Sequence, residues 1–350
     1  MNRKTVPLVY SLAIPIGVGA LVAIALAPFG ETPLEGVTLL VKGAFGSWRR
    51  VSETLVKTSP LLFTGLAVAL AFRCGAFNIG AEGQFLIGAL ASVAVGANLG
   101  LDSPWIGVPL VLGAAFLGGA IWGGIAGALK AWRDVPEVIS TIMLNFIALF
   151  WISALIRGPL KNPTSGLPES PEVVEAAYLP RLSDLGDFPG YRVHLGLLLG
   201  ILSAIAIWIL LTRTVLGFKM RAVGFNPDAA RFSGYHPKRI WAASLALSGA
   251  IAGLGGGIEV TAITFRIWDD FSPGYGYTAI AVALLARLHP LAVVLTAFFF
   301  GVLDQGAGLL QRDLGVPLVV IYLVQGLVIL MTIGMGFHRP GEPGKEGGEK

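Results

Sequence analysis

The sequence contains few charged residues and a single cysteine. Lys, Arg, Asp and Glu make up 13% of its 350 residues and apolar residues 55%, whereas a soluble domain carries about 25% charged residues. Such a composition cannot cover a water-soluble surface. Cys74, as the single cysteine, excludes an internal disulfide, and the four histidines lack the spacing of metal ligands. The sequence therefore indicates neither redox nor metal chemistry and predicts no cofactor.

Motifs for energy conversion and catalysis are also absent from the sequence. No segment matches the phosphate-binding pattern G-x-x-x-x-G-K-S/T, and no clear acidic or histidine relay suggests proton coupling. No clustered nucleophile, base or metal set indicates a membrane-embedded enzyme. The net charge of +4 is small and spread over loops, which argues against a nucleic-acid partner. We therefore expect a protein that is not an enzyme and that takes its energy from another subunit.

What the sequence does contain is a succession of apolar windows. They lie at 8–28, 60–76, 83–99, 106–129, 138–157, 194–212, 241–261, 276–287, 290–310 and 317–336. We predict an all-α, polytopic transmembrane helix bundle with about ten spans and with broken or re-entrant helices. The window at 276–287 is only about 18 Å long at the helical rise. It predicts half of a broken hairpin that turns at Arg287-Leu288-His289-Pro290.

The distribution of Lys and Arg predicts the orientation of the chain. Most of these residues lie on the side of the N-terminus, which places both termini in the cytoplasm by the positive-inside rule. Lys42, Arg49, Arg50 and Lys57 oppose this orientation. The window at 8–28 resembles a signal peptide, and we interpret it as a retained first span because its apolar part is long and many spans follow.

The remaining segments complete the predicted domain organisation, a single transmembrane domain at 1–337. Residues 34–53 predict an amphipathic or re-entrant helix, and the proline-containing segment 158–193 predicts an ordered, irregular loop on the outer side, suited to an external partner. The segment 217–239 predicts a cytoplasmic loop. Residues 338–350, rich in Gly, Glu and Lys, predict a disordered tail.

A short helix with complete end signals is predicted within 217–239. Asn226 is the expected N-cap, Pro227 fits the first helical position, Asp228 suits the positive helix end and Gly234 fits the left-handed position after the last turn. The residues that this surface would present or depend on are Arg221, Gly224, Asn226, Pro227, Asp228, Ala229, Ala230, Arg231, Phe232 and Gly234. Such a helix suits docking in a groove of a soluble partner and equally suits contact with anionic lipid.

Polar residues at membrane depth form a second candidate site. Phe77, Asn78, Glu82 and Gln84 lie in a glycine-interrupted run, and Asn145 lies near the middle of the window at 138–157. Buried polar groups in a membrane are costly unless they are paired or face a water-filled path. One interpretation is a broken helix that lines a translocation path. The other is a tight turn in which Asn78 caps the next helix and Glu82 stabilises its start.

Two ladders of small residues predict close helix packing. Ala115, Gly119, Gly123 and Gly127 recur at every fourth position, and so do Gly249, Gly253 and Gly257. This pattern gives a smooth helix face. We interpret both ladders as scaffold.

Three motifs together resemble a known family. They are GAFNIGAEGQ at 75–84, TIMLN at 141–145 and GFNPDAARFSG at 224–234. They are similar to the permease subunits of bacterial ABC importers for nucleosides, within a larger group that serves ribose, other simple sugars and branched-chain amino acids. The similarity runs from about Ser59 to Gly334. Tyr235-His236 and Arg287-Leu288-His289-Pro290 depart from the pattern usual in that group.

The resemblance implies a larger assembly in the bacterial cytoplasmic membrane. Two permease subunits would form the pore above two cytoplasmic ABC ATPase subunits, and an external solute-binding protein would deliver the solute. The helix at 226–234 would then be the coupling helix that docks on an ATPase. The length of the loop 158–193 favours a non-identical second permease. A sugar or branched-chain amino acid permease and a secondary transporter remain the alternatives.

Overall fold

The computed structural model describes residues 33–98, 100, 103–184, 186 and 191–315, and the single residues 317, 319, 323, 326 and 327. This part of the chain is helical and contains no β-strand, only the isolated bridges Glu169–Trp268 and Arg181–His194. The predicted first span at 8–28 and the tail at 338–350 lie outside the described residues, as does most of the window at 317–336.

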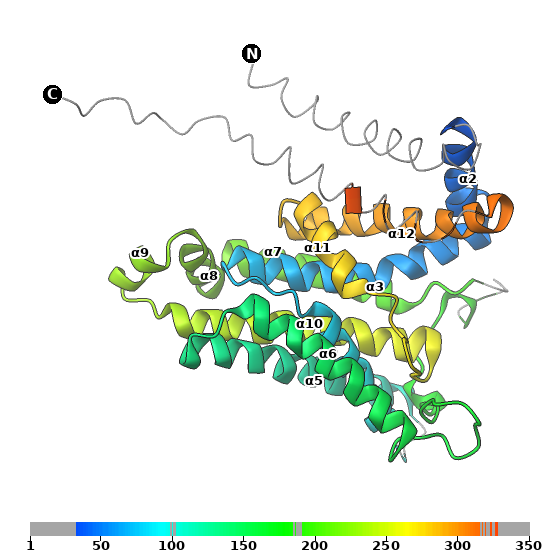
Figure 1. The fold of residues 1–350 in the computed structure, drawn as a ribbon, viewed down its shortest axis with the longest axis horizontal. Coiled ribbons are helices and arrows are strands. Elements are labelled where there is room, and N and C mark those ends of the chain that lie inside the picture. Colours follow the sequence, from blue (N-terminus) through cyan, green and yellow to red (C-terminus); the bar gives the residue numbers. More distant parts are fainter. Residues whose placement is uncertain are drawn as a thin grey trace.

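The described helices form one bundle, in which the long helices run side by side (Figure 1). Helices α8 and α9 lie at one end of the bundle, and the irregular segment that follows α6 lies at the opposite end. The helices are α2 (Pro33–Phe45), α3 (Trp48–Arg73), α4 (Ala81–Gly96), α5 (Pro104–Arg133), α6 (Glu137–Arg157), α7 (Leu195–Arg213), α8 (Val215–Phe225), α9 (Pro227–Phe232), α10 (Pro237–Glu259), α11 (Tyr275–Leu285) and α12 (Pro290–Leu314).

Each predicted window between 60 and 310 falls on a helix, which confirms the all-α membrane bundle. Six of the helices are long and apolar enough to cross a membrane: α3, α5, α6, α7, α12 and the continuous stretch Pro237–Thr264 that begins with α10. Helices α4 and α11 are shorter, with 16 and 11 residues. The described residues thus contain six full-length candidates rather than a complete set of ten.

The short window at 276–287 is a broken hairpin, as predicted. Helix α11 ends because Arg287 and Leu288 adopt left-handed backbone conformations, with φ of 51° and 58°. Pro290 then occupies the first position of α12. The chain therefore reverses direction after α11 has completed only about three helical turns, at about 3.6 residues per turn.

The segment 34–53, predicted as an amphipathic or re-entrant helix, is divided between two helices. Helix α2 ends at Phe45, and α3 begins at Trp48 with Ser47 as its N-cap. Beyond its exposed first residues, α3 packs against α2 and α12: the Thr54 hydroxyl donates to the Ala44 carbonyl at 3.1 Å, and Lys57 pairs with Asp304 at 3.0 Å. An apolar window misses such a helix start because the partners of its polar groups lie elsewhere in the chain.

The two ladders of small residues face each other between α5 and α10. A Cβ added to Gly119 would lie 2.1 Å from the carbonyl oxygen of Gly249, and one added to Gly253 would lie 2.5 Å from that of Ala115. The two backbones approach so closely that no larger side chain fits between them. The predicted scaffold role agrees with this packing, which joins the two long helices at the centre of the bundle.

Helix α8 has no counterpart in the sequence prediction, which treated residues 217–239 as one loop around a short helix. Thr214 separates α7 from α8. It is the N-cap of α8, because its hydroxyl accepts the N–H of Gly217 at 3.1 Å. A Cβ on Gly217 would lie 1.9 Å from the Leu210 carbonyl oxygen, so α8 folds back against the end of α7. Thr214 was the local signal for this helix start, because threonine is a preferred N-cap residue.

Candidate functional site

The starts of α4 and α11 meet inside the bundle. The Glu82 carboxylate, in the first turn of α4, accepts the backbone N–H of Gly276, in the first turn of α11, at 2.6 Å. A Cβ on Gly276 would lie 2.1 Å from the Glu82 nitrogen, so the two backbones are in contact. A carboxylate is favourable at a helix start, where N–H groups lack partners. Glu82 therefore stabilises the start of α11 as well as lying at the start of its own helix.

Asn78 and Gln84 form a buried network with α10. The Asn78 amide nitrogen donates to Gln84 at 2.8 Å and to the Ser248 hydroxyl at 2.8 Å, and Gln84 donates back to Asn78 at 3.1 Å. The Asn78 side-chain oxygen also accepts the N–H of Gly80 at 2.8 Å. Gly80 is the N-cap residue of α4, so the expectation that Asn78 caps this helix is corrected. Asn78 instead shapes the turn that precedes it.

Asn145 connects α6 to the same turn. Its side-chain oxygen accepts the N–H of Gly83 at 2.8 Å, and its nitrogen donates to the Ile79 carbonyl at 2.9 Å. Asn145 is 2% exposed and Phe77 is 53% exposed. Among the five predicted path residues, Phe77 alone presents a largely exposed side chain, while the four polar residues are buried and hold the chain between α3 and α4.

The turn between α3 and α4 is also tied to α5, α6 and α10 by a cluster that the sequence prediction missed. Lys130 pairs with Glu137 at 2.5 Å and lies 4.5 Å from the ring centroid of Trp241. Glu137 accepts the N–H of Phe77 at 3.2 Å, and Trp241 donates to the Cys74 carbonyl at 3.2 Å. Cys74, Phe77 and Trp241 lie far in the sequence from the Lys130–Glu137 pair, and no local pattern relates them to it.

Helix α9 has the end signals that the sequence predicts. The Asn226 side chain accepts the N–H groups of Asp228 and Ala229, both at 3.0 Å, and Gly234 has a φ of +82°. Pro227 occupies the first helical position. The helix extends from Pro227 to Phe232, so the predicted capped helix of about two turns is confirmed.

The surface around α9 exposes two large apolar side chains at an end of the bundle that also carries charged residues. Phe225 is 86% exposed and Phe232 is 94% exposed, whereas Ala230 packs inward and is 4% exposed. Arg231, in the last turn, is largely exposed too. Two exposed phenylalanines, one at each end of a short helix, are typical of a binding surface rather than of a solvated helix.

Gly224 joins the α9 region to the rest of the bundle. A Cβ on Gly224 would lie 2.2 Å from the Arg73 carbonyl oxygen, and Gly75, with a φ of +73°, lies against the same glycine. Arg73 in turn donates to the Leu288 carbonyl, in the turn between α11 and α12, at 3.0 Å. Three segments thus meet at Arg73: the end of α8, the end of α3 and the turn between α11 and α12. The Nε of Arg221 is buried in this region and has no partner among the described residues.

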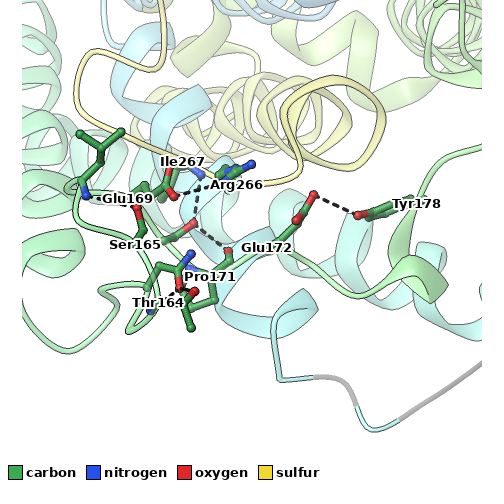
Figure 2. A network of polar contacts seen from close by, with 11 residues as sticks. Thr164, Ser165, Glu169, Pro171, Glu172, Tyr178, Arg266 and Ile267 are labelled. Carbon is green, nitrogen blue, oxygen red and sulfur yellow. Dashed lines mark hydrogen bonds and ion pairs between the residues drawn. The ribbon is translucent and has the colours of Figure 1, made fainter.

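The loop 158–193 is ordered and irregular in the part that the structure describes. Figure 2 shows how it attaches to the segment after α10: Glu169 pairs with Arg266 at 2.9 Å, and the Ser170 hydroxyl accepts the N–H of Ile267 at 3.0 Å. Tyr178 donates to Glu172 at 3.2 Å. Burial and the neighbouring Glu172 carboxylate raise the pKa of Tyr178 to about 12. The loop is therefore held by side chains along its length.

Comparison with known proteins now identifies the family. Residues 50–333 match the family described as the permease component of the branched-chain amino acid transport system. This chain belongs to that family. A glucose ABC transporter permease of Haloferax volcanii is 37% identical over 96% of this chain and 91% of its own length. A guanosine ABC transporter permease of Bacillus subtilis is 38% identical, covering 95% and 93%. No solved structure matches the chain.

The family assignment establishes the class of protein to which this fold belongs. The chain is a multi-pass membrane permease of an ABC transport system and not an enzyme, and ATP hydrolysis belongs to a separate ATPase subunit. It is also similar to a second guanosine permease of Bacillus subtilis, at 31% identity over 72% of this chain. A nucleoside ABC transporter permease of Lactococcus lactis is 33% identical over 94% of it.

Proposed function

We propose that this permease carries nucleosides into a bacterial cell as one of two non-identical pore subunits. The names of the guanosine and nucleoside permeases, which match nearly the whole chain, support this solute class. The two guanosine permeases of one organism, both similar to this chain, support a pair of different subunits. A glucose permease of similar identity makes a simple sugar the second candidate.

We place a single permease domain, residues 1–337, in the cytoplasmic membrane. The end with α9 faces the cytoplasm together with both termini, the loop 158–193 faces the external solute-binding protein, and residues 338–350 form a cytoplasmic tail. The cations near α9, Arg221, Arg231, Lys238 and Arg239, support this orientation. Membrane lipid surrounds the apolar helix faces.

The observation that carries the coupling proposal is the exposed, fully capped helix α9. Phe225 and Phe232 enter a groove of the ATPase, and Arg231 lies beside them on the contact surface. Nucleotide-driven movement of the ATPase displaces α9 and α8. The close contact of Gly224 with Arg73 then passes the displacement to the end of α3 and to the α11–α12 turn.

The proposed solute path runs beside the joined starts of α4 and α11. Phe77 offers an exposed ring on which a nucleobase can stack. Asn78, Glu82, Gln84 and Asn145 act by holding the two helix starts, because their hydrogen bonds lie within the protein. Movement of the turn after α3, at Gly75, would change the position of Phe77.

Transport by the reconstituted assembly tests this function. The permease pair, the ATPases and the solute-binding protein are placed in proteoliposomes, and uptake of labelled guanosine, glucose and leucine is compared with and without ATP. We expect ATP-dependent uptake of guanosine. Uptake of glucose or leucine instead would contradict the solute class, and uptake that follows an ion gradient without ATPase would contradict the coupling.

A further inference from the structure

A pocket of about 240 Å³ lies between the loop 158–193 and the start of α7. Its walls are apolar: Pro180 and Leu182 come from the loop, and Leu197, Leu198 and Ile201 come from α7. Leu198 is 52% exposed, so the pocket opens along the outer face of this membrane-spanning helix. A polar solute would find few partners along these walls.

His194 contributes an unused hydrogen-bond donor to the pocket. Its side chain is buried, and its Nδ1 accepts the N–H of Gly196 at 3.1 Å. Because Nδ1 is an acceptor, the ring proton lies on Nε2. Nε2 is buried and has no partner among the described residues.

Arg181 supplies positive charge at the same end of the pocket. Its Nε donates to the Ala262 carbonyl at 2.7 Å, and its guanidinium lies 4.6 Å from the ring centroid of Phe265. It forms no ion pair within the described part of the chain, although the Asp184 carboxylate accepts its backbone N–H at 2.8 Å. The neighbouring Arg192, by contrast, is paired with Glu53 at 3.3 Å.

We propose that this pocket binds an anionic phospholipid from the adjacent leaflet. Oxygen atoms of the phosphate or the glycerol ester accept hydrogen bonds from Arg181 and His194, and an acyl chain lies along Leu198 and Ile201. The pocket joins one cation and one unpaired donor to an apolar wall that continues along a spanning helix, and this is the chemistry of a lipid at the membrane interface. The bound lipid would fasten the loop 158–193 to α7.

The test measures thermal stabilisation of the purified full-length permease in neutral detergent. Phosphatidylglycerol, phosphatidylcholine and inorganic phosphate are titrated separately, and native mass spectrometry counts the lipids retained. We expect phosphatidylglycerol to raise the Tm more than the other two. Arg181→Gln should weaken its apparent affinity about tenfold, the size of one charge-assisted hydrogen bond. Arg213→Gln, at the other end of α7, should leave the affinity unchanged.

A second variant keeps the proposal testable if Arg181→Gln destabilises the loop. Leu198→Trp fills the pocket without removing any hydrogen bond, and Leu202→Trp on the same helix is its control because Leu202 is equally exposed, at 51%, and lies outside the pocket. Loss of phosphatidylglycerol binding in Leu198→Trp alone supports the proposal. Equal binding in both variants, equal stabilisation by phosphatidylcholine, or equal stabilisation by inorganic phosphate would overturn it.

Discussion

The two ends of the bundle are built in opposite ways. At one end, the last residue of α8, Phe225, and the last residue of α9, Phe232, are exposed, and the end of α8 approaches the backbone of α3 at Gly224. At the other end, the loop 158–193 is fastened by ion pairs and by hydrogen bonds along its length (Figure 2). The first end carries the exposed surface on which we propose that the ATPase docks. The second is largely complete by itself and holds its shape.

This difference matters for transport because the two ends would perform different tasks. A coupling element has to move as one body, so it needs short, rigid links to the bundle and a free outer face. A docking platform for an external protein has to keep its shape while the bundle moves. The following predictions test whether the ends respond to substitution in these different ways.

The largest expected effect is at the exposed face of α9. Phe232→Ala should reduce ATP-dependent uptake about thirtyfold, because a buried aromatic anchor at an interface contributes about 2 kcal/mol or more. The Tm of the isolated permease should not change, since Phe232 is 94% exposed. Trp105→Ala, a 90% exposed aromatic at the start of α5, is the control and should keep uptake. Equal losses in both variants would contradict a docking role.

A smaller effect, on both uptake and stability, is expected at Gly224. The added Cβ of Gly224→Ala would clash with the Arg73 carbonyl oxygen, and overpacking costs about 1–3 kcal/mol. We expect a lower Tm and uptake reduced about tenfold, because the end of α8 must shift away from α3 to make room for the added Cβ. Gly308→Ala is the matched control, because a Cβ there meets nothing within 4 Å. Should the two variants behave alike, the close contact would not transmit movement.

Loss of the α9 cap should have a moderate effect. Asn226→Ala removes the acceptor for the N–H groups of Asp228 and Ala229, which costs about 1 kcal/mol and should reduce uptake about fivefold. Asn226→Ser restores a capping side chain and should recover most of the uptake. The measurement is ATP-dependent uptake at several ATPase concentrations, and a failure of Asn226→Ser to recover activity would exclude capping as the cause.

The smallest effect is expected at the loop end. Glu169→Gln breaks the ion pair with Arg266, and a partly exposed pair contributes about 0.2–1 kcal/mol. Uptake should change less than about twofold, because Ser170 and other loop residues keep their bonds to the segment after α10. Hydrogen exchange of residues 169–178 reports the local loosening. A tenfold loss of uptake would show that this end is as sensitive as α9.

The sequence alone predicted those features whose signals are local. The end signals of α9 lie within nine residues, from Asn226 to Gly234, and each acts on the backbone next to it. The two ladders of small residues, which contain Gly119 and Gly249, could also be recognised in the sequence, because small residues at every fourth position define a helix face. The turn at Arg287-Leu288-His289-Pro290 was predicted from the short window before it and from its proline.

What the tertiary structure decided is how the buried polar residues are paired. Glu82 bonds to Gly276, Asn145 bonds to Ile79 and Gly83, and Lys57 pairs with Asp304, all across long stretches of sequence. An apolar environment requires each such group to find a partner, but it does not specify which one. The sequence by itself therefore determined the helices and the capped element at one end, because these depend on near neighbours. The meeting of the α4 and α11 starts was decided only when the whole bundle packed.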